Sequence, residues 1–371
     1  MNKKIKILHT EWSDGWGGQE IRILAESKAF ILKGYGVFIA AQPDSELFKR
    51  SNQEKIPTFS IKMNKGINII SIIKFIKFIK KNHIDIVHTH SSVDSRTAGI
   101  AAKIAGVKVV RSRHISIPIS KSYLTWWQYM RLADRVIASG RDIRNTMIQD
   151  NKMLSEQIAS APAGVSTEQF SINRQLEDIR PNYNLDHSHF VVGIVSVLRS
   201  WKGHQYLIEA IKSLTKSIPN IRLIIVGDGP QKQNIEKLIQ ELDMKEYIIL
   251  AGHQTDPASF YQAMDVMVLP SYAGEATSQV LPQAMLMGKP VISTNTGGLS
   301  EVVIHNQTGL IVPIKNSKAI VKAIQLLFND SGLRIKLADQ GRAHAIKNFT
   351  FEKMIETTEQ VYLDVLNLKI L

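Results

Sequence analysis

The sequence predicts an α/β protein made of two doubly wound domains, each with a parallel sheet. Short runs rich in Val and Ile alternate with helix-length segments along the 371 residues, a pattern typical of parallel sheets with crossover helices. The alternation pauses in a polar stretch near the middle and then starts again, and the chain is long enough for two cores. No short-period similarity links the segments, which excludes a repeat array.

The first half contains five β-branched runs that are expected to form strands. They are residues 5–10, 35–41, 84–90, 107–113 and 135–139. Helices fit between them, and the segment GQEIRILAESKAFILKGYG ends in a glycine-rich stop, as helices often do.

The second half repeats this arrangement with six expected strands. They are residues 191–198, 222–229, 247–252, 265–270, 290–294 and 309–313. Residues 165–187 are polar and poorly periodic, which favours a link between domains. We therefore predict an N-terminal domain 1–165, a linker 166–187, a C-terminal domain 188–348, and a C-terminal helix 349–371 that can pack back on the first domain. Because ligands bind beyond the carboxyl ends of strands in such sheets, we expect a site between the domains.

The composition is that of a globular protein, with 44% hydrophobic and 21% charged residues. The chain has no cysteine, which excludes disulfides and thiolate metal sites and favours a reducing cytoplasm. No stretch approaches the roughly 20 apolar residues of a membrane span. The expected location is cytoplasmic, with peripheral attachment to the inner face of the cytoplasmic membrane as the alternative.

The net charge of +13 is confined to the first half of the chain. Residues 1–175 contain 27 Lys+Arg and 14 Asp+Glu, whereas residues 176–371 contain 19 of each. An anionic partner for the first half is therefore expected, such as a membrane surface or a phosphate-bearing ligand. No nucleic-acid-binding motif is present, so nucleic acid is not an expected partner.

Two loops that follow predicted strands carry the residue types that phosphates need. In SDGWGGQE (13–20), glycines such as Gly17 and Gly18 let the backbone approach an anion at the start of a helix. In VLRSWKGHQYL (197–207), Arg199 and Lys202 could neutralise the charge that develops on a diphosphate leaving group. Ordinary turns with solvated cations are the alternative interpretation.

Histidines stand at the ends of two predicted strands. His114 could hydrogen-bond a sugar hydroxyl or transfer a proton, although a lone histidine is more often structural. His88 and His90 in VHTH invite comparison with a zinc site, but no third ligand follows at a typical spacing. We therefore expect no metal.

Residues 67–83 (INIISIIKFIKFIKKNH) predict a basic amphipathic helix. Lys74, Lys77 and Lys81 recur at helical spacing, and such a helix suits an anionic lipid surface as well as ordinary packing on a sheet. The segment SKSYLTWWQYMR (120–131) adds aromatic residues among cations, which fits a bilayer interface or a lipid-linked acceptor.

PSYAGEATSQVLPQAMLMGKPVISTNTGGLSEVV (270–303) resembles the retaining glycosyltransferases of family 4, which have the GT-B fold. The resemblance extends over nearly the whole chain, through GWGGQE, RSWKGH, GDGP, NQTGLIVP and the last helix. It implies the family's pattern of Pro-Ser, a first motif glutamate, a small-residue helix and Gly-Gly-x-x-Glu.

The resemblance also implies roles for individual residues. Glu275 matches the first motif glutamate, which touches the donor sugar in the family. Arg199 and Lys202 match the cations at the diphosphate, and His114 matches the histidine near the acceptor and donor sugar. The donor's phosphates would meet the Gly17–Gly18 loop and the backbone before the next helix, formed by Ala276, Thr277, Ser278 and Gln279.

Two features depart from the family pattern. Gln283 replaces the second motif glutamate, which accepts bonds from the ribose in the family. An amide oxygen can still accept, but without the negative charge. Arg199 and Lys202 are separated by two residues, a tighter loop than the usual spacing.

The resemblance thus implies a retaining, metal-independent glycosyltransferase of the hexosyltransferase type, without a cofactor. The C-terminal domain would bind a nucleotide-sugar donor, and the N-terminal domain a lipid-linked, polysaccharide or lipopolysaccharide acceptor. The alternatives are a non-catalytic sugar- or lipid-binding protein and a sugar-nucleotide epimerase on the same fold.

Overall fold

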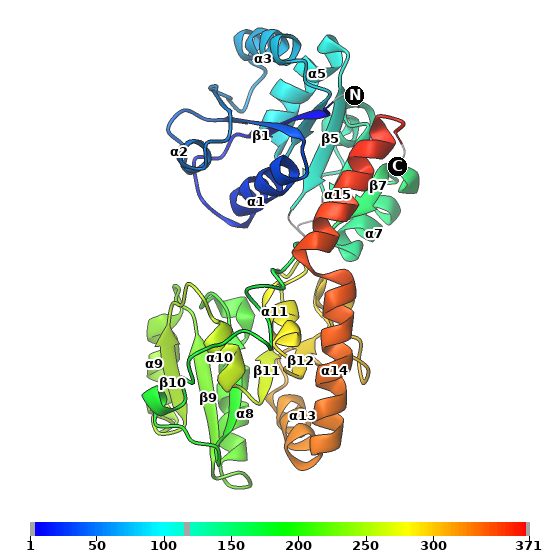
Figure 1. The fold of residues 1–371 in the computed structure, drawn as a ribbon. Coiled ribbons are helices and arrows are strands. Elements are labelled where there is room, and N and C mark those ends of the chain that lie inside the picture. Colours follow the sequence, from blue (N-terminus) through cyan, green and yellow to red (C-terminus); the bar gives the residue numbers. More distant parts are fainter. Residues whose placement is uncertain (1–3, 115–118, 369–371) are drawn as a thin grey trace. The chain divides into compact units, whose positions relative to one another are not determined.

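The computed structural model describes residues 4–114 and 119–368 and divides into two compact units. Unit 1 contains Met1–Pro162 and Met354–Leu371, and unit 2 contains Ala163–Lys353. Figure 1 follows the chain through both. The parts of the predicted N-terminal domain at 1–3 and 115–118, and of the predicted C-terminal helix at 369–371, lie outside the described residues.

Unit 1 is built on a seven-stranded sheet with the order β3-β2-β1-β4-β5-β6-β7, in which every neighbouring pair is parallel. The strands are β1 (Lys6–Glu11), β2 (Gly36–Ala41), β3 (Thr58–Ser60), β4 (Ile86–Thr89), β5 (Lys108–Arg113), β6 (Arg135–Ala138) and β7 (Ile158–Ser160). The chain order reverses at the β1–β4 pair, the kind of position where ligands bind in open parallel sheets.

Helices cover this sheet. They are α1 (Gly18–Leu32), α2 (Glu46–Gln53), α3 (Ile69–Asn82), α4 (Ser92–Asp94), α5 (Ile100–Ala105), α6 (Tyr123–Trp127), α7 (Arg141–Gln149) and α15 (Phe351–Val365). Phe75 of α3 and Ala101 of α5 pack with Leu8 and Val87 of the strands in one core. Ile23 of α1 and Leu47 of α2 pack with Ile39 of β2 in another.

Helix α15 packs on unit 1. A C-terminal helix that can pack back on the first domain is the expectation from the sequence. The ring of Tyr362 lies 5.1 Å from that of Phe30 in α1. The hydroxyl of Tyr35 donates to Glu359 at 2.9 Å. The last helix therefore completes the core of the first unit, although it follows unit 2 in the chain.

Unit 2 contains a six-stranded parallel sheet with the order β10-β9-β8-β11-β12-β13. The strands are β8 (Phe190–Val195), β9 (Ile221–Val226), β10 (Ile248–Gly252), β11 (Val266–Leu269), β12 (Val291–Thr294) and β13 (Leu310–Val312). Every residue of β8, β11 and β12 is buried. Burial on both faces is what continuous apolar runs in a parallel sheet predict.

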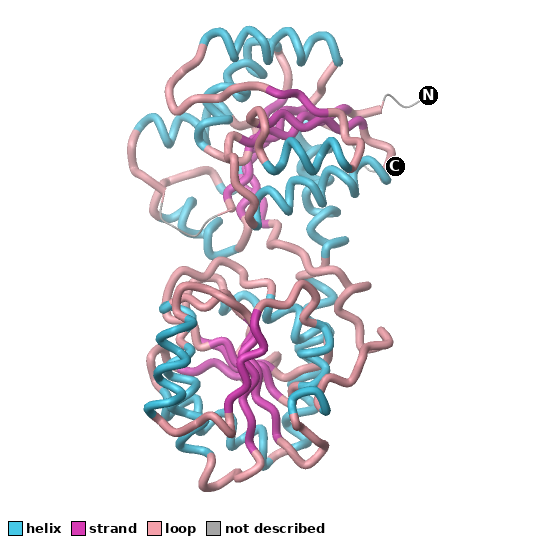
Figure 2. The backbone as a smooth tube through the Cα atoms, turned by 90° about the vertical axis from the view of Figure 1, so that its left-hand side faces the viewer, coloured by secondary structure: helices cyan, strands magenta, loops and turns pink. Residues whose placement is uncertain are grey.

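Helices flank both faces of this sheet, as Figure 2 shows for the strands of unit 2. They are α8 (His204–Leu214), α9 (Lys232–Glu241), α10 (Ala258–Ala263), α11 (Val280–Leu286), α12 (Leu299–Val302), α13 (Ser317–Asn329) and α14 (Ser331–Asn348). Helices α8, α9 and α13 contribute to one core, and α10, α11 and α12 contribute to the other. The predicted fold class, two doubly wound parallel-sheet domains, is confirmed.

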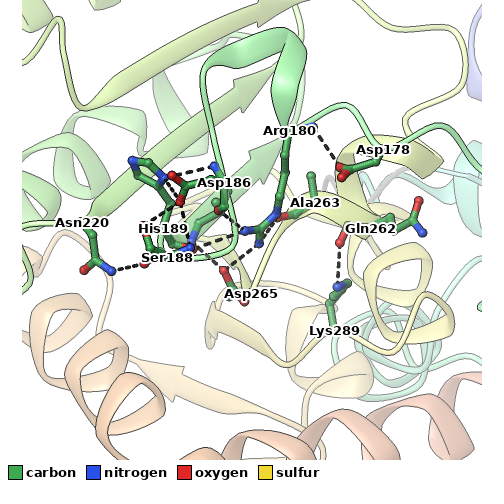
Figure 3. A network of polar contacts seen from close by, with 11 residues as sticks. Asp178, Arg180, Asp186, Ser188, His189, Asn220, Gln262, Ala263, Asp265 and Lys289 are labelled. Carbon is green, nitrogen blue, oxygen red and sulfur yellow. Dashed lines mark hydrogen bonds and ion pairs between the residues drawn. The ribbon is translucent and has the colours of Figure 1, made fainter.

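The segment 166–187, expected to link the domains, packs into unit 2. Phe170, Ile179 and Leu185 are buried in its core. Figure 3 shows Arg180 at the centre of a polar network: its guanidinium donates to the carbonyl of Ala263 and to Asp265 Oδ2. The apolar residues of this segment are irregularly spaced, so no periodicity reveals that they are buried.

Among the described residues, no helix is both long and apolar enough to cross a bilayer. Strands β3 and β7 were not among the predicted strands, whereas all the predicted ones are present.

Candidate active site

Glu275 lies in the loop between β11 and α11 of unit 2, at the carboxyl end of the sheet. It is 6% exposed. Lys202 Nζ donates to Glu275 Oε1 at 2.5 Å, and the hydroxyl of Ser271 donates to the same oxygen at 2.6 Å. The structure therefore brings together two of the predicted site residues, Glu275 and Lys202, as a nearly buried ion pair.

The loop that carries Glu275 is held by close backbone approaches. Gly297 has φ of 54°, and a Cβ on it would lie 2.0 Å from the carbonyl oxygen of Glu275. Gly203, with φ of 76°, comes equally close to Pro270, because a Cβ there would lie 2.1 Å from its carbonyl oxygen. Only glycine fits these positions without movement of the backbone. The two glycines thus set the position of the carboxylate relative to Lys202.

Arg199 lies in the same loop as Lys202 but takes a different direction. Its guanidinium stands 5.1 Å from the centre of the Trp201 ring, and the residue is exposed. The backbone of Trp201 accepts a hydrogen bond from Tyr272 N at 2.8 Å, which ties the two loops together. Arg199 is therefore available to an anion at the surface, whereas the charge of Lys202 is offset by Glu275.

Gln283 occupies the middle of α11, and its side chain is half-buried. The hydroxyl of Tyr261 donates to Gln283 Oε1 at 2.9 Å. Burial raises the pKa of Tyr261 well above its usual value, so this hydroxyl stays a donor. A carbonyl oxygen has a second lone pair, and the amide can therefore accept from a ligand hydroxyl as well as from Tyr261.

Residues 276–279 connect Glu275 to the start of helix α11. Ala276 and Thr277 pass close to Gly298, where a Cβ would lie 3.0 Å from their backbone. Ser278 follows, half-buried. The side chain of Gln279 donates to the carbonyl of Gly164 at 2.8 Å, so it holds the first segment of unit 2.

Unit 1 contains a cluster of four histidines at the carboxyl ends of three adjacent strands. His9 in β1 is in register with His88 in β4, and His90 and His114 follow β4 and β5. His9 Nδ1 lies 3.0 Å from His90 Nε2, and His90 Nδ1 lies 2.9 Å from His114 Nε2. The predicted site residue His114 is therefore the outer member of a hydrogen-bonded chain.

Burial keeps these histidines neutral. It lowers the pKa of His9 to about 3, with a further contribution from the charge of Arg22. Burial likewise lowers the pKa of His88, His90 and His114 well below the ordinary value. The fourth ring, His88, is held by the hydroxyls of Tyr362 and Ser112 at 2.7 and 2.8 Å.

Three of these histidines are close enough to be considered as metal ligands. Ring nitrogens of His9, His88 and His90 lie within 4.8 Å of one another. Both nitrogens of His88 and His90 already make hydrogen bonds, and the positive charge of Arg22 acts on all three rings. An ion would have to break these bonds beside a cation, so the geometry favours a hydrogen-bonded cluster. The absence of a metal stays a prediction.

The glycine-rich loop after β1 is anchored by a buried carboxyl group. Glu11 accepts hydrogen bonds from Trp12 N at 2.8 Å and Ser13 N at 2.9 Å, and from the side chain of Gln19. Burial and then the nearby Asp94 raise the pKa of Glu11 to about 8. Gly17 precedes the first turn of α1, where Gly17 N donates to Glu20.

Gly18 opens helix α1 and is exposed, and a Cβ on it would have no atom within 4 Å. The backbone there is open to a ligand. Sequence reasoning missed His9, Glu11 and Asp94 as parts of this edge. The sequence contains one signal for Glu11, which is a carboxylate placed directly after the predicted strand 5–10 and before a glycine-rich loop.

Comparison with known proteins follows the same division of the chain. Residues 175–344 match the family model of glycosyl transferases group 1, and residues 16–169 match that of Glycosyltransferase Family 4. The solved glycosyltransferase from Rickettsia africae ESF-5 has a TM-score of 0.89 and 23% sequence identity, covering 99% of this chain and 100% of that chain. The similarity to this solved structure shows the fold alone.

Two curated relatives are glycosyltransferases by their names, one of capsular polysaccharide biosynthesis and one that acts on a diphosphoundecaprenol-linked sugar. The capsular polysaccharide biosynthesis glycosyltransferase CapM of Staphylococcus aureus is 28% identical over 239 residues, 63% of this chain and 62% of that protein. The UDP-Gal:alpha-D-GlcNAc-diphosphoundecaprenol alpha-1,3-galactosyltransferase of Escherichia coli is 24% identical over 381 residues, 98% of each. The chain is thus a glycosyltransferase with the GT-B fold, and each of its halves resembles one of these two families, which confirms the glycosyltransferase part of the predicted enzyme class.

Proposed function

We propose that this chain is a retaining glycosyltransferase that transfers a hexosyl group from a UDP-sugar to a lipid-linked or polysaccharide acceptor without a metal ion. The observation that carries the proposal is the Glu275 carboxylate, held by Lys202 and Ser271 at the carboxyl end of the unit 2 sheet. One oxygen, Oε1, receives both bonds, so Oε2 is left to accept hydrogen bonds from sugar hydroxyls. The E. coli relative, which by its name uses UDP-Gal and a diphosphoundecaprenol acceptor, supports the choice of donor and acceptor.

Leaving-group charge is met by side chains and backbone in this proposal. Arg199 is exposed beside Trp201 and can reach a diphosphate. Lys202 has further N–H donors beside the one that it gives to Glu275. The backbone at 276–279 contributes N–H groups before α11. Fixed positive groups of this kind stabilise a developing diphosphate in the transition state. The acceptor hydroxyl oxygen attacks sugar C1 from the same face that the diphosphate leaves, so the new glycosidic bond forms as the bond from C1 to the phosphate oxygen breaks. That phosphate oxygen takes the proton of the acceptor hydroxyl.

A donor screen tests the first half of the proposal. We expect a UDP-sugar to raise the Tm of the wild type, because a ligand at 100 times its Kd stabilises by about 2.7 kcal/mol. In Glu275→Gln, the UDP-sugar should lose its advantage over UDP alone, since the contact to the sugar is weakened. Glu209→Gln, an exposed glutamate on α8, is the control and should behave as the wild type.

Product analysis tests the reaction. Transfer should require the acceptor, and the anomeric proton of the product should show the coupling of the donor's configuration. Conversion of the donor without an acceptor would instead indicate an epimerase. Binding of UDP-sugar without any turnover would indicate a sugar-binding protein, and no binding of any UDP-sugar would overturn the choice of donor.

For the acceptor side we propose that unit 1 docks on an anionic lipid surface on the cytoplasmic face of a membrane. Ile67, Ile69 and Ile70 near the start of α3 are 67%, 68% and 68% exposed. The lysines Lys74 and Lys77 on the same helix are also exposed. Exposed aliphatic side chains beside cations suit an interface between lipid headgroups and acyl chains. The apolar residues of α3 are only partly buried in unit 1. Ile72, Phe75 and Ile79 are buried, whereas Ile73 is exposed to solvent.

Sedimentation with vesicles tests this docking. Vesicles that contain anionic lipid should bind the protein at low salt, and less of it at high salt. Ile69→Ser/Ile70→Ser should bind more weakly, whereas Ile335→Ser, which removes a 61% exposed isoleucine of unit 2, should not. Failure of the wild type to bind anionic vesicles at low salt would overturn the proposal.

A further inference from the structure

The chain of three imidazoles in unit 1 has a consequence for the chemistry of His114. A neutral imidazole carries one N–H and one lone pair. Because His90 uses both nitrogens, toward His9 at 3.0 Å and toward His114 at 2.9 Å, its single proton can lie on one side only. The three protons must therefore all sit on Nδ1 or all on Nε2, and the two arrangements give His114 opposite roles.

We propose that His9 and His90 hold His114 in the tautomer with its proton on Nδ1, so that His114 donates a hydrogen bond to an oxygen atom of the bound substrate. In this arrangement His9 Nδ1–H donates to His90 Nε2, and His90 Nδ1–H donates to His114 Nε2. The oxygen would be a sugar hydroxyl or a phosphate oxygen. The inference rests on the proposed function for the presence of that substrate, and it assigns His9 and His90 as positioning residues.

The surroundings of His9, the inner member of the three hydrogen-bonded imidazoles, decide between the two arrangements of protons. His9 Nε2 is fully buried and has no hydrogen-bond partner among the described residues. The charged group that acts on His9 is Arg22, whose guanidinium is held by Glu26 at 2.7 Å and by the carbonyl of Ala161 at 2.9 Å. A nearby cation favours a lone pair on this nitrogen over a second N–H, because the N–H carries partial positive charge.

His114, the outer member of the three hydrogen-bonded imidazoles, is open to a ligand. His114 is half-buried, and its Nδ1 has no hydrogen-bond partner in the described part of the chain. A proton taken up at this nitrogen would leave a cation in a buried cluster that already faces Arg22 and Arg113. Burial and these charges keep the ring neutral. The arrangement therefore supplies a fixed donor and opposes a proton-accepting role.

Nitrogen NMR reads the tautomer directly. In the full chain labelled with ¹⁵N-histidine, long-range ¹H–¹⁵N correlations distinguish a protonated ring nitrogen from a bare one, and His114→Ala assigns the signal. We expect His114 to show a protonated Nδ1 and a bare Nε2, unchanged from pH 8 to pH 6. A protonated Nε2, or a ring that titrates in this range, would overturn the proposal.

A pair of substitutions at His90 tests the positioning role. The amide of His90→Asn can still donate to His114 Nε2, whereas His90→Leu cannot. We expect kcat/KM to fall roughly tenfold in the leucine variant, as when one hydrogen bond is lost, with the His114 signal split between tautomers. The asparagine variant should keep the tautomer and most of the activity.

The outcomes separate this inference from the proposed function. If both folded variants lose activity equally and keep the wild-type tautomer, His90 only fills space and the inference fails. If the leucine variant does not fold, the tautomer of the wild type still decides. If the wild type shows the expected tautomer but transfers no sugar from any sugar nucleotide, the proposed function is wrong. The hydrogen bond from His114 to a substrate oxygen is then rejected with it, whereas the tautomer set by His9 and His90 is still supported.

Discussion

Lys202 and Glu275 meet in a site from which water is largely removed, since their side chains are 16% and 6% exposed. A charge left alone in such a place is destabilising, because it has lost both water and its partner. The pair can be neutral in its net contribution to stability and still be sensitive to the loss of either member. In the free protein Glu275 therefore also keeps the Lys202 ammonium in place.

A double-mutant cycle checks this coupling. Lys202→Met and Glu275→Gln should each lower the free energy of unfolding of unit 2, the lysine change by about 3 kcal/mol, the low end for a buried pair, because it leaves a nearly buried carboxylate without its cation. The double variant should lose less than the sum of the two single losses, measured by urea unfolding. Strict additivity would contradict a direct interaction.

Glu11 is the second residue with an unusual charge state. Its pKa of about 8 lies above the value of an unfolded glutamate, so the folded state holds a proton that the unfolded state releases above about pH 4.5. Stability from this group is therefore lost as the pH rises from 4.5 to 8.

Glu11→Gln should remove that loss, because the amide oxygen still accepts from Trp12 N and Ser13 N. Its Tm relative to the wild type is expected to increase steadily from pH 5 to pH 8. The exposed Glu156→Gln should show a constant difference over the same range. An equally constant difference for Glu11→Gln would mean that Glu11 is ionised in the folded protein.

At the scale of elements, the loops at the carboxyl end of the unit 2 sheet depend on one another. The loop after β12 carries Gly297, which presses against the backbone of Glu275 in the loop after β11. The loop after β8 reaches the same place through Lys202. The site is thus formed by three loops whose backbones are in contact, rather than by one flexible segment.

Gly297→Ala should disturb this contact. A Cβ placed 2.0 Å from a carbonyl oxygen, at φ of 54°, forces a backbone shift and an unfavourable conformation, together roughly 2–3 kcal/mol. Thermal unfolding should detect the loss, and affinity for a UDP-sugar should fall because Glu275 moves. Gly332→Ala is the control, since Gly332 lies exposed at the start of α14 without close backbone contacts. Equal effects of the two substitutions would contradict the contact.

For the whole molecule, buried neutral histidines make stability sensitive to acid. Buried His9, His88 and His90 and half-buried His114 lie in unit 1, and His204 in unit 2 has its pKa lowered to about 4 by burial and by Lys202. Below pH 6.5 the unfolded chain binds protons that the folded chain does not. Stability is therefore lost as the pH falls, at up to about 1.4 kcal/mol per pH unit for each such histidine.

Tm measured between pH 7 and pH 5 should fall steeply for the wild type. His9→Gln should reduce the slope, because one buried titrating group is removed. His83→Asn should leave it unchanged, since His83 is exposed in a left-handed helix cap that asparagine tolerates. A shallow, variant-independent slope would mean that the cluster is already protonated or accessible to solvent.

The sequence predicted the strands that local apolar patterns mark, but it did not predict the edge strands of the unit 1 sheet. Strands β3 and β7, which were not predicted, are the two edge strands of the unit 1 sheet and have three residues each. Edge strands need fewer apolar residues, so no long β-branched run marks them. Gln283 looked like a weakened ribose contact in the sequence, and the structure adds a bond from Tyr261, a pairing between positions 22 residues apart that no spacing rule predicts.

The sequence by itself determined the two parallel-sheet domains, the basic first half and the glutamate motif around Glu275, because these depend on residue type and on short spacings. Tertiary structure alone decided that His9, His90 and His114 form one chain, because the order β1-β4-β5 sets which strand ends are neighbours. That order arises from pairing between segments about 80 and 20 residues apart, and a local pattern contains no record of it. The same is true of Lys202 and Glu275, which close packing of three separate loops brings within 2.5 Å.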